Sequence, residues 1–243
     1  YEIHRDRFPY WSVEFVAQGK GALRLGPHAC DLAAGALFAY GPGIAQDIVS
    51  DAGQPLVKYF VDFTGRRAKP LLEQYAPAPG AIVQTAAPSE VLGLWDALIR
   101  EGLKDTPHAR RSCALLLELL LVKIAETAVP PGAAASPAFA TYRRCKQHIE
   151  EDWRRLRTLD QLAAECHVDA SHLCRLFQRF DHQSPYQYLL RLKMNYAAKR
   201  LQELAPVKQI TEEVGFGDPF HFSRVFKSVM GVPPSQFARF GNR

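Results

Sequence analysis

Apolar residues follow two different spacings along this chain, and the spacing changes near residue 63. Before that point they form short runs rich in β-branched and aromatic side chains, separated by turns that contain glycine or proline. Short strands at regular intervals are typical of a small antiparallel barrel or jelly roll. The runs predict strands at 11–17, 21–25, 36–40, 44–49 and 57–63.

Helical spacing follows, because apolar residues then recur three and four positions apart. It predicts a short helix at 67–75, a helix at 88–103 that Pro88 opens, and a longer helix at about 109–128. The longest of the three is apolar on two faces, so it must be covered twice. The strands cover one face, and either a partner helix or the core of the same chain covers the other.

The stretch 129–138 is rich in proline, glycine and alanine and has no periodicity, which predicts an interdomain linker. A chain of 243 residues is also longer than a single domain usually is. We therefore expect an α+β protein of two domains. Residues 1–128 form a barrel with helices, and residues 139–243 form an all-α domain.

The second domain repeats itself imperfectly at a spacing of 48 to 49 residues. Each copy contains a short helix, a turn and a longer amphipathic helix, at about 158–180 and about 207–229. A long helix at 187–204 joins the copies. Two helix-turn-helix units on a rigid helix predict binding to successive major grooves of duplex DNA, about 34 Å apart.

The second unit carries clear local signals. Gly215 suits the left-handed end of a helix, Asp218 suits an N-cap, and Pro219 suits the first turn of the next helix. In both units, helical periodicity places apolar residues on an inner face and polar residues on the opposite face. The outer faces supply the predicted DNA contacts, which are Ser171, His172, Arg175, Gln178, Phe220, His221, Arg224 and Lys227.

Charge is distributed unevenly between the two domains. Residues 139–243 contain 17 Lys+Arg and 11 Asp+Glu, a net charge of +6. Residues 1–138 contain 13 and 14, a net charge of −1. A basic surplus confined to the helix-turn-helix half favours a phosphate backbone as its partner.

The end of the chain resembles the signature of the AraC/XylS family of bacterial transcription regulators. The matching residues are Gly215-Phe216, Phe222-Ser223-Arg224, Phe226-Lys227, Gly231 and Pro234. The resemblance implies a double helix-turn-helix domain joined to a cupin-like sensory barrel, transcription activation rather than enzymatic activity, and double-stranded DNA and RNA polymerase as partners. It also implies a homodimer held by the long apolar helix, with candidate contacts at Leu116, Leu117, Leu120 and Ile124.

The resemblance further implies that the barrel binds a small effector, often a sugar. Alternation in the last predicted strand puts Lys58, Phe60 and Asp62 on one face, and this mixture of charge and aromatic surface suits a polyol. An ordinary solvated strand face explains the same alternation, so a regulator of this fold without an effector is the alternative. Further candidate effector contacts are Arg5, Glu14 and Gln46.

The first domain resembles a cupin without the residues of a metal centre. Gln46 stands where a cupin carries a metal-binding histidine, and His28 is a single histidine that we assign to a turn. We therefore expect no metal and no cofactor, which argues against a cupin enzyme fused to a DNA-binding module. The cupin-like positions are Gly35, Pro42 and Gly43.

Cysteine usage and hydropathy indicate the cellular compartment in which we expect the protein to act. The five cysteines form no CxxC pair, which fits a reducing compartment, and no apolar run approaches the roughly 20 residues that span a bilayer. No signal peptide is visible, and we expect native residues before Tyr1. The sequence predicts a cytoplasmic regulator with no membrane partner. One group of ligand-type side chains matches no zinc-finger spacing, namely Cys166, His167, His172 and Cys174.

Overall fold

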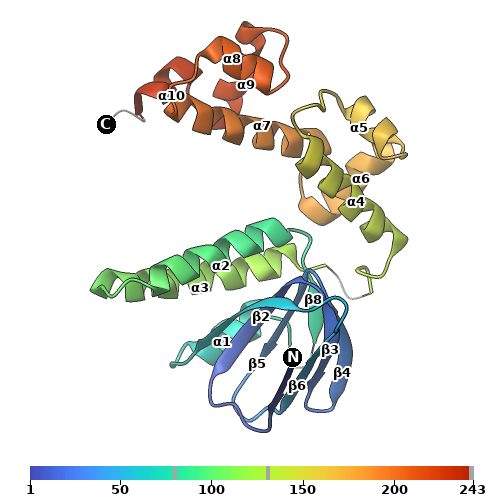
Figure 1. Cartoon of the computed structure of the whole chain (residues 1–243), viewed down its shortest axis with the longest axis vertical. Helices are drawn as coiled ribbons and strands as arrows, with labels where there is room; N and C mark the ends of the chain where they lie inside the picture. The colour runs from blue at the N-terminus through green and yellow to red at the C-terminus, as the bar shows by residue number, and fades with distance from the viewer. Residues whose placement is uncertain (79–80, 130–131, 241–243) are drawn as a thin grey trace. The chain divides into compact units, whose positions relative to one another are not determined.

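The computed structural model describes residues 1–78, 81–129 and 132–240 (Figure 1). The chain divides into two compact units, 1–134 and 135–243, which confirms the α+β class with a β-rich first half and a helical second half. No helix in the described ranges is both long and apolar enough to cross a membrane.

The first unit contains two antiparallel four-stranded sheets. In spatial order the first sheet holds β1 (Glu2–Arg5), β6 (Gln46–Ser50), β3 (Lys20–Leu25) and β4 (His28–Ala33). The second sheet holds β7 (Val57–Phe63), β2 (Trp11–Gln18), β5 (Ala36–Tyr40) and β8 (Ile82–Gln84).

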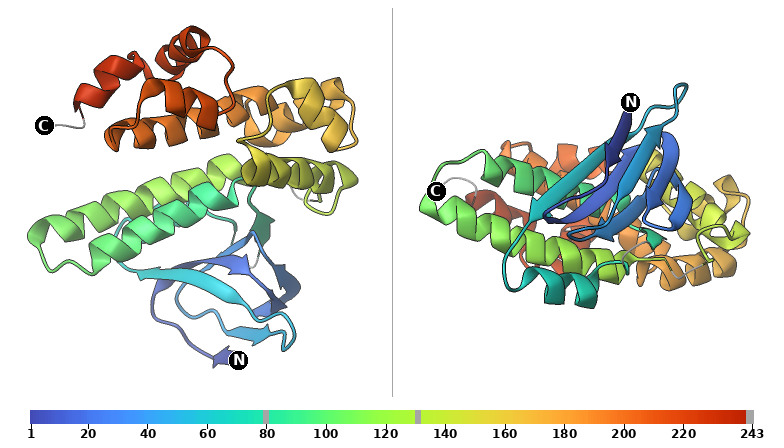
Figure 2. Two further views of the ribbon diagram at one scale, coloured as in Figure 1. Left: turned by 45° about the horizontal axis from the view of Figure 1, so that its top comes forward. Right: turned by 90° about the horizontal axis from the view of Figure 1, so that it is seen from below.

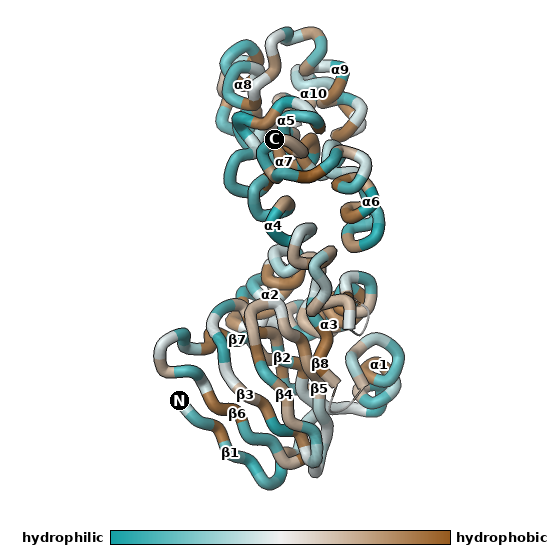
Figure 3. Tube along the Cα trace, turned by 90° about the vertical axis from the view of Figure 1, so that its right-hand side faces the viewer, coloured by the Kyte–Doolittle hydropathy of each residue, from teal (hydrophilic) through white to brown (hydrophobic). Residues whose placement is uncertain are grey.

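The sheets face one another across a shared core. Side chains that alternate inward from both sheets are fully buried there, as expected for a pleated strand with one covered face. Hydrophobic positions recur along the strands of both sheets in the hydropathy-coloured trace (Figure 3). The core includes Val16, Leu23, Leu25, Leu32, Phe38, Tyr40 and Ile48.

Three helices pack on the other face of the β7-β2-β5-β8 sheet. They are α1 (Ala68–Tyr75), α2 (Pro88–Gly102) and α3 (Pro107–Thr127), and α2 and α3 lie side by side (Figure 2). Trp95 of α2 is fully buried against Tyr59 of β7. Consecutive residues of β2 point to opposite faces of the sheet. Because this second core covers the outer face, the residues from Ser12 to Val16 are all buried.

All five predicted strands are present within one or two residues at most ends, but the strand count was too low. β1, β4 and β8 were missed because their short, mixed sequences show no alternation strong enough to identify a strand without its neighbours. His28, predicted in a turn, is the first residue of β4 and pairs with Leu25.

The second unit contains only helices. α5 and α6 form the first helix-turn-helix and α8 and α9 the second, with α7 between them. The bounds are α4 (Pro137–Asp152), α5 (Leu159–Glu165), α6 (Ala170–Asp181), α7 (Pro185–Gln202), α8 (Val207–Glu213), α9 (Pro219–Met230) and α10 (Pro234–Phe240).

Two boundaries differ from the prediction. The predicted linker extends into structured segments at both ends: Val129 is buried and donates to Gln84 O, and α4 begins at Pro137. Pro130 and Pro131 lie outside the described residues. The predicted connecting helix 187–204 instead begins at Pro185, because Ser184 and Gln187 form a capping box, and it ends at Gln202.

Candidate DNA-binding faces and effector site

The first candidate recognition helix, α6, is held by its inner face and leaves its outer face to solvent. The Asp169 carboxylate accepts a hydrogen bond from the His172 backbone N–H and so caps the helix. Ser171, Arg175 and Gln178 are exposed and His172 is half-buried, as predicted from periodicity. The inner face is buried through Leu173, Leu176, Phe177 and Phe180.

An ion pair that the sequence did not reveal anchors the end of α6. Lys146 of α4 lies 3.1 Å from Asp181, and both side chains are at least 90% buried. His182 follows with a φ of 53°, so a non-glycine residue ends this helix in the left-handed region. The pairing joins residues far apart in sequence, and no local pattern announces it.

The ends of the second candidate recognition helix, α9, are marked by residues that the sequence analysis identified. Asp218 caps its start, Gly231 follows its end, and Gly215 follows the preceding helix α8. Gly215 has a φ of 75° and Gly231 a φ of 81°. The Asp218 carboxylate accepts from the N–H groups of Phe220 and His221, and these bonds lower the pKa of Asp218. The predicted outer face is exposed at Phe220, His221, Arg224 and Lys227, with Phe220 81% exposed.

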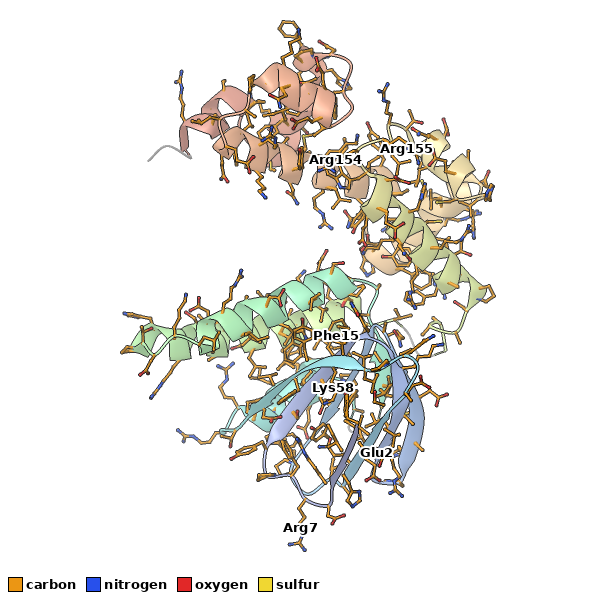
Figure 4. All side chains as sticks on the ribbon, viewed as in Figure 1. Glu2, Arg7, Phe15, Lys58, Arg154 and Arg155 are labelled. Carbon is orange, nitrogen blue, oxygen red and sulfur yellow. The ribbon has the colours of Figure 1, made fainter. Side chains whose placement is uncertain are left out.

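The candidate effector residues lie on the inner faces of the two sheets, and some of them come together. The Lys58 ammonium is 2.5 Å from the Glu14 carboxylate, and the side chains are only 10% and 2% exposed (Figure 4 labels Lys58). Asp62 accepts a hydrogen bond of 2.7 Å from the Ser12 hydroxyl. β2 and β7 pair in a register that brings these four side chains onto one face.

Tyr40 extends this polar group from β5. Its hydroxyl donates to Glu14 at 2.7 Å, and burial together with the Glu14 charge raises the pKa of Tyr40. Gln46, on the opposite sheet, is 1% exposed and lies near enough to the Tyr40 hydroxyl to offset part of the rise in the pKa of Tyr40. Neither polar atom of its amide completes a hydrogen bond of ordinary geometry in the described part of the chain. Sequence reasoning missed Ser12 and Tyr40, although alternation from Glu14 would have found Ser12.

Three of the predicted effector residues are placed less favourably, and one of them, Asp62, is exposed near the end of β7. Phe60 is 56% exposed, with the Lys58 ammonium 5.3 Å from its ring centroid, so it is not an internal platform. Arg5 pairs with Gln46 along β1 and β6, but its guanidinium lies over the Phe8 ring at 4.9 Å.

A separate cavity of about 360 Å³ lies between α1 and the helix-covered side of the sheet. Its lining is mostly apolar and includes Trp11, Leu72 and Pro77. Lys69 and Glu73 are the charged residues of this lining. Sequence periodicity did not indicate it, because α1 and the sheet contribute to it jointly. Among the described residues, no three His, Cys, Asp or Glu side chains gather as a metal site requires.

Comparison with known proteins finds a matching family for each of the two units of the chain. The family described as AraC-like ligand binding domain matches residues 1–125, which is more than half of the chain. A helix-turn-helix domain family matches residues 162–239. The chain belongs to the AraC family.

Relatives of this AraC-family protein include operon regulators. The Msm operon regulatory protein of Streptococcus mutans is 23% identical, over 93% of this chain and 83% of its own. The MmsAB operon regulatory protein of Pseudomonas aeruginosa is 24% identical, over 98% of this chain and 78% of its own. The protein is a transcriptional regulator with a ligand-binding domain, and both of these relatives are named as regulatory proteins.

Solved structures with detectable similarity include the C-terminal domain of AraT, a response regulator from Geobacillus stearothermophilus. It is 31% identical and covers 43% of this chain and 86% of its own, with a TM-score of 0.40. ToxT from Vibrio cholerae is 12% identical and covers 98% of this chain and 92% of its own, with a TM-score of 0.39.

The predicted dimer residues of this AraC-family chain need correction. Leu120 and Ile124 are completely buried in the core formed with the sheet, so a partner has no access to them. Leu116 and Leu117 are partly buried and pack on the same core. The prediction was wrong for Leu120 and Ile124 because a helix apolar on two faces does not show from sequence which face the rest of the chain covers. The exposed stripe of α3 consists of Leu115, Leu119 and Val122.

Proposed function

We propose that this AraC-family protein contacts specific base pairs through α6 and α9 and changes its DNA binding when a small polar ligand occupies the inner face of its β-rich unit. The observation that carries the ligand site is the buried Gln46 amide, which faces Tyr40 but completes no hydrogen bond of ordinary geometry among the described residues. Leaving a buried polar group unsatisfied costs about 1–3 kcal/mol, and a ligand that hydrogen-bonds to it relieves that cost.

The neighbouring groups favour a hydroxyl-rich ligand. Glu14 is an acceptor, and the hydroxyls of Ser12 and Tyr40 both donate and accept. Lys58 neutralises Glu14, so the group as a whole suits a neutral polyol or a sugar acid that exchanges with one partner of the pair. A sugar or a related polar metabolite therefore remains the proposed effector class.

Thermal unfolding of the full chain against a panel of sugars and sugar acids tests the effector. We expect at least one compound to stabilise the wild-type chain and not Gln46→Leu. Without ligand, Gln46→Leu should be at least as stable as wild type, because the change removes an unsatisfied amide from the interior. Gln54→Leu, at an exposed position, is the matched control and should keep the ligand response.

The alternative is a regulator of the same fold without an effector. It is favoured if no compound of the panel shifts the unfolding of the wild-type chain. Loss of the response in Gln54→Leu as well as in Gln46→Leu would contradict the assignment of the site to the inner face.

We also propose that the protein acts as a homodimer and activates transcription in the cytoplasm with RNA polymerase as its protein partner. The exposed stripe of Leu115, Leu119 and Val122 on α3 supports the dimer, because three large apolar side chains on one helix face are costly to leave in water.

A further inference from the structure

A small pocket in the helical unit lies where the two helix-turn-helix units meet. It encloses about 170 Å³ and is bounded by the segment before α5, by α7, by the turn between α8 and α9, and by the start of α9. Water occupies about 30 Å³ per molecule in the liquid, so the pocket has room for a group of about five or six heavy atoms. The lining residues are Arg157, Tyr186, Leu190, Lys193, Gly215, Phe216, Gly217 and His221.

The lining is basic and contains no carboxylate. The exposed guanidinium of Arg157 makes no ion pair or side-chain hydrogen bond within the described ranges. His221 is exposed, and its ring packs on Phe216 with the centroids 5.4 Å apart. The backbone N–H of Gly217 also has no acceptor among the described residues. The Arg157 guanidinium and the Gly217 N–H are donors, and the His221 ring can donate from one nitrogen, which is the chemistry that an oxyanion requires.

Lys193 supplies the buried charge of this pocket. The side chain belongs to a residue only 3% exposed, and its ammonium donates to Val214 O at 2.5 Å and Arg154 O at 3.4 Å. An ammonium has three N–H groups, so these two carbonyls leave one without an oxygen acceptor, and the ammonium also lies 6.0 Å from the centroid of the Phe216 ring. Gly215 allows this approach, since a Cβ there would lie 2.9 Å from Arg154 O and 3.3 Å from the Lys193 ammonium.

The position of the pocket indicates which phosphate would reach it. Arg157 leads into the first unit through its N–H, which donates to Gln161 of α5, whereas Gly217 and His221 belong to the second unit. His221 also lies on the exposed face of α9 beside Phe220 and Arg224. A helix in the major groove brings the flanking phosphates to its N-terminal end, and such contacts fix the register of the protein on the duplex.

We propose that the pocket bounded by Arg157, Lys193 and His221 binds one phosphate of the DNA backbone and thereby fixes both helix-turn-helix units on the same duplex. The inference rests on DNA binding by this chain. It adds a sequence-independent contact between the two base-contacting helices.

The salt dependence of DNA binding tests the contact. The full chain selects a duplex from a random pool, and its affinity for that duplex and for an unrelated duplex is measured at several salt concentrations. Arg157→Gln should make the slope of log K against log salt less negative by about 0.9 and weaken both duplexes equally. Arg66→Gln, which removes an exposed arginine from the β-rich unit, should leave the slope unchanged.

A pH profile tests the part played by Lys193. Burial and then the charge of Arg157 lower the pKa of Lys193 to about 8, so its charge disappears as the pH rises through that value. DNA affinity of the wild-type chain should fall between pH 7 and pH 9, and Lys193→Arg should remove that loss, because arginine stays charged. The other titratable groups lining this site are Arg157, Tyr186 and His221, and the nearby Asp218 carboxylate is engaged with the N–H groups of Phe220 and His221.

The outcomes separate the possible sources of the phosphate. An unchanged salt slope in Arg157→Gln, with inorganic pyrophosphate stabilising the wild-type chain but not this variant, overturns DNA as the source and assigns the pocket to a small phosphorylated compound. An unchanged slope without any pyrophosphate effect overturns the pocket altogether. Failure of the wild-type chain to select any duplex contradicts the DNA-binding function instead.

Discussion

At the scale of single residues, Glu14 and Lys58 form an ion pair almost wholly removed from solvent, with side-chain exposures of 2% and 10%. Removing one partner of such a pair leaves the other charge uncompensated, which costs about 3–5 kcal/mol. We predict that Lys58→Met lowers the free energy of unfolding by about this amount in urea denaturation. Lys20→Met, at an exposed position, should change it by less than about 0.5 kcal/mol.

The double variant Glu14→Gln/Lys58→Met is the check on this explanation. It removes both charges together, so it should recover much of the stability lost by Lys58→Met. A single variant as stable as wild type would show that water reaches the pair and that its burial is not the controlling factor.

Glu165 gives the first helix-turn-helix unit a defined response to acid. Hydrogen bonds from Arg155, then from Gln161 and His148, lower the pKa of Glu165 to about 2 (Arg155 is labelled in Figure 4). A carboxylate with a depressed folded-state pKa stabilises the fold above the pKa of the unfolded chain, about 4.5, and loses that contribution as the pH falls to about 2.

We therefore predict that Glu165→Gln is less stable than wild type at pH 7, and that the difference in Tm shrinks between pH 4.5 and pH 2. Glu212→Gln is the control, since Glu212 is exposed and its side chain makes no ion pair in the described ranges. A constant difference across this pH range would contradict the role of the Glu165 charge.

At the scale of elements, α3 has two apolar faces that differ in burial: one packs in the core of its own chain and the other is exposed. Leu120 is completely buried in the core of its own chain, whereas Leu119 beside it is 45% exposed. We predict that Leu119→Glu gives folded monomers, because it places a charge in the proposed dimer contact. Leu120→Glu should instead unfold the β-rich unit, because it buries an unpaired charge.

Sedimentation velocity together with circular dichroism distinguishes the two variants. A dimer that survives Leu119→Glu at unchanged affinity would place the interface on another surface of the chain.

The two recognition helices each carry an exposed arginine, at Arg175 in α6 and at Arg224 in α9. A bidentate arginine–guanine contact contributes about 1–3 kcal/mol of discrimination at one base pair. We predict that Arg175→Ala loses that discrimination on selected operator variants. Arg224→Ala should weaken all duplexes alike and reduce the salt dependence, as loss of a phosphate contact does.

Binding measured on a set of single-base operator variants, at several salt concentrations, decides between these two roles. If Arg175→Ala keeps both its affinity and its base preference, the outer face of α6 is not the base-contacting face.

At the scale of the whole molecule, an effector site in one unit can regulate a DNA site in the other only if binding at the two sites is coupled. Coupling between two binding equilibria is reciprocal. We predict that the factor by which saturating effector changes DNA affinity equals the factor by which saturating DNA changes effector affinity, when both are measured by calorimetry or anisotropy. Gln46→Leu should reduce the first factor to one. Unequal factors would show that a third equilibrium, such as dimerisation, takes part.

Local chemistry determined much of the helical unit directly from the sequence. Gly215, Asp218 and Gly231 fix the ends of helices through groups only a few positions away, so their roles need no knowledge of distant partners. The same holds for the capping of α6 by Asp169. The repeated pattern of buried residues in α6 and α9 likewise follows from a period of 3.6 alone.

Contacts between distant segments decided the rest. The strands β1, β4 and β8 are recognisable only through the strands they pair with, and the covered face of α3 is set by the sheet beneath it. The polar group around Glu14 depends on a register that joins β2 to β5 and β7. The pocket at Lys193 likewise requires α7 to pack against helices of both helix-turn-helix units. Sequence periodicity specifies which residues share a face of one element, but only the packing of elements specifies what that face meets.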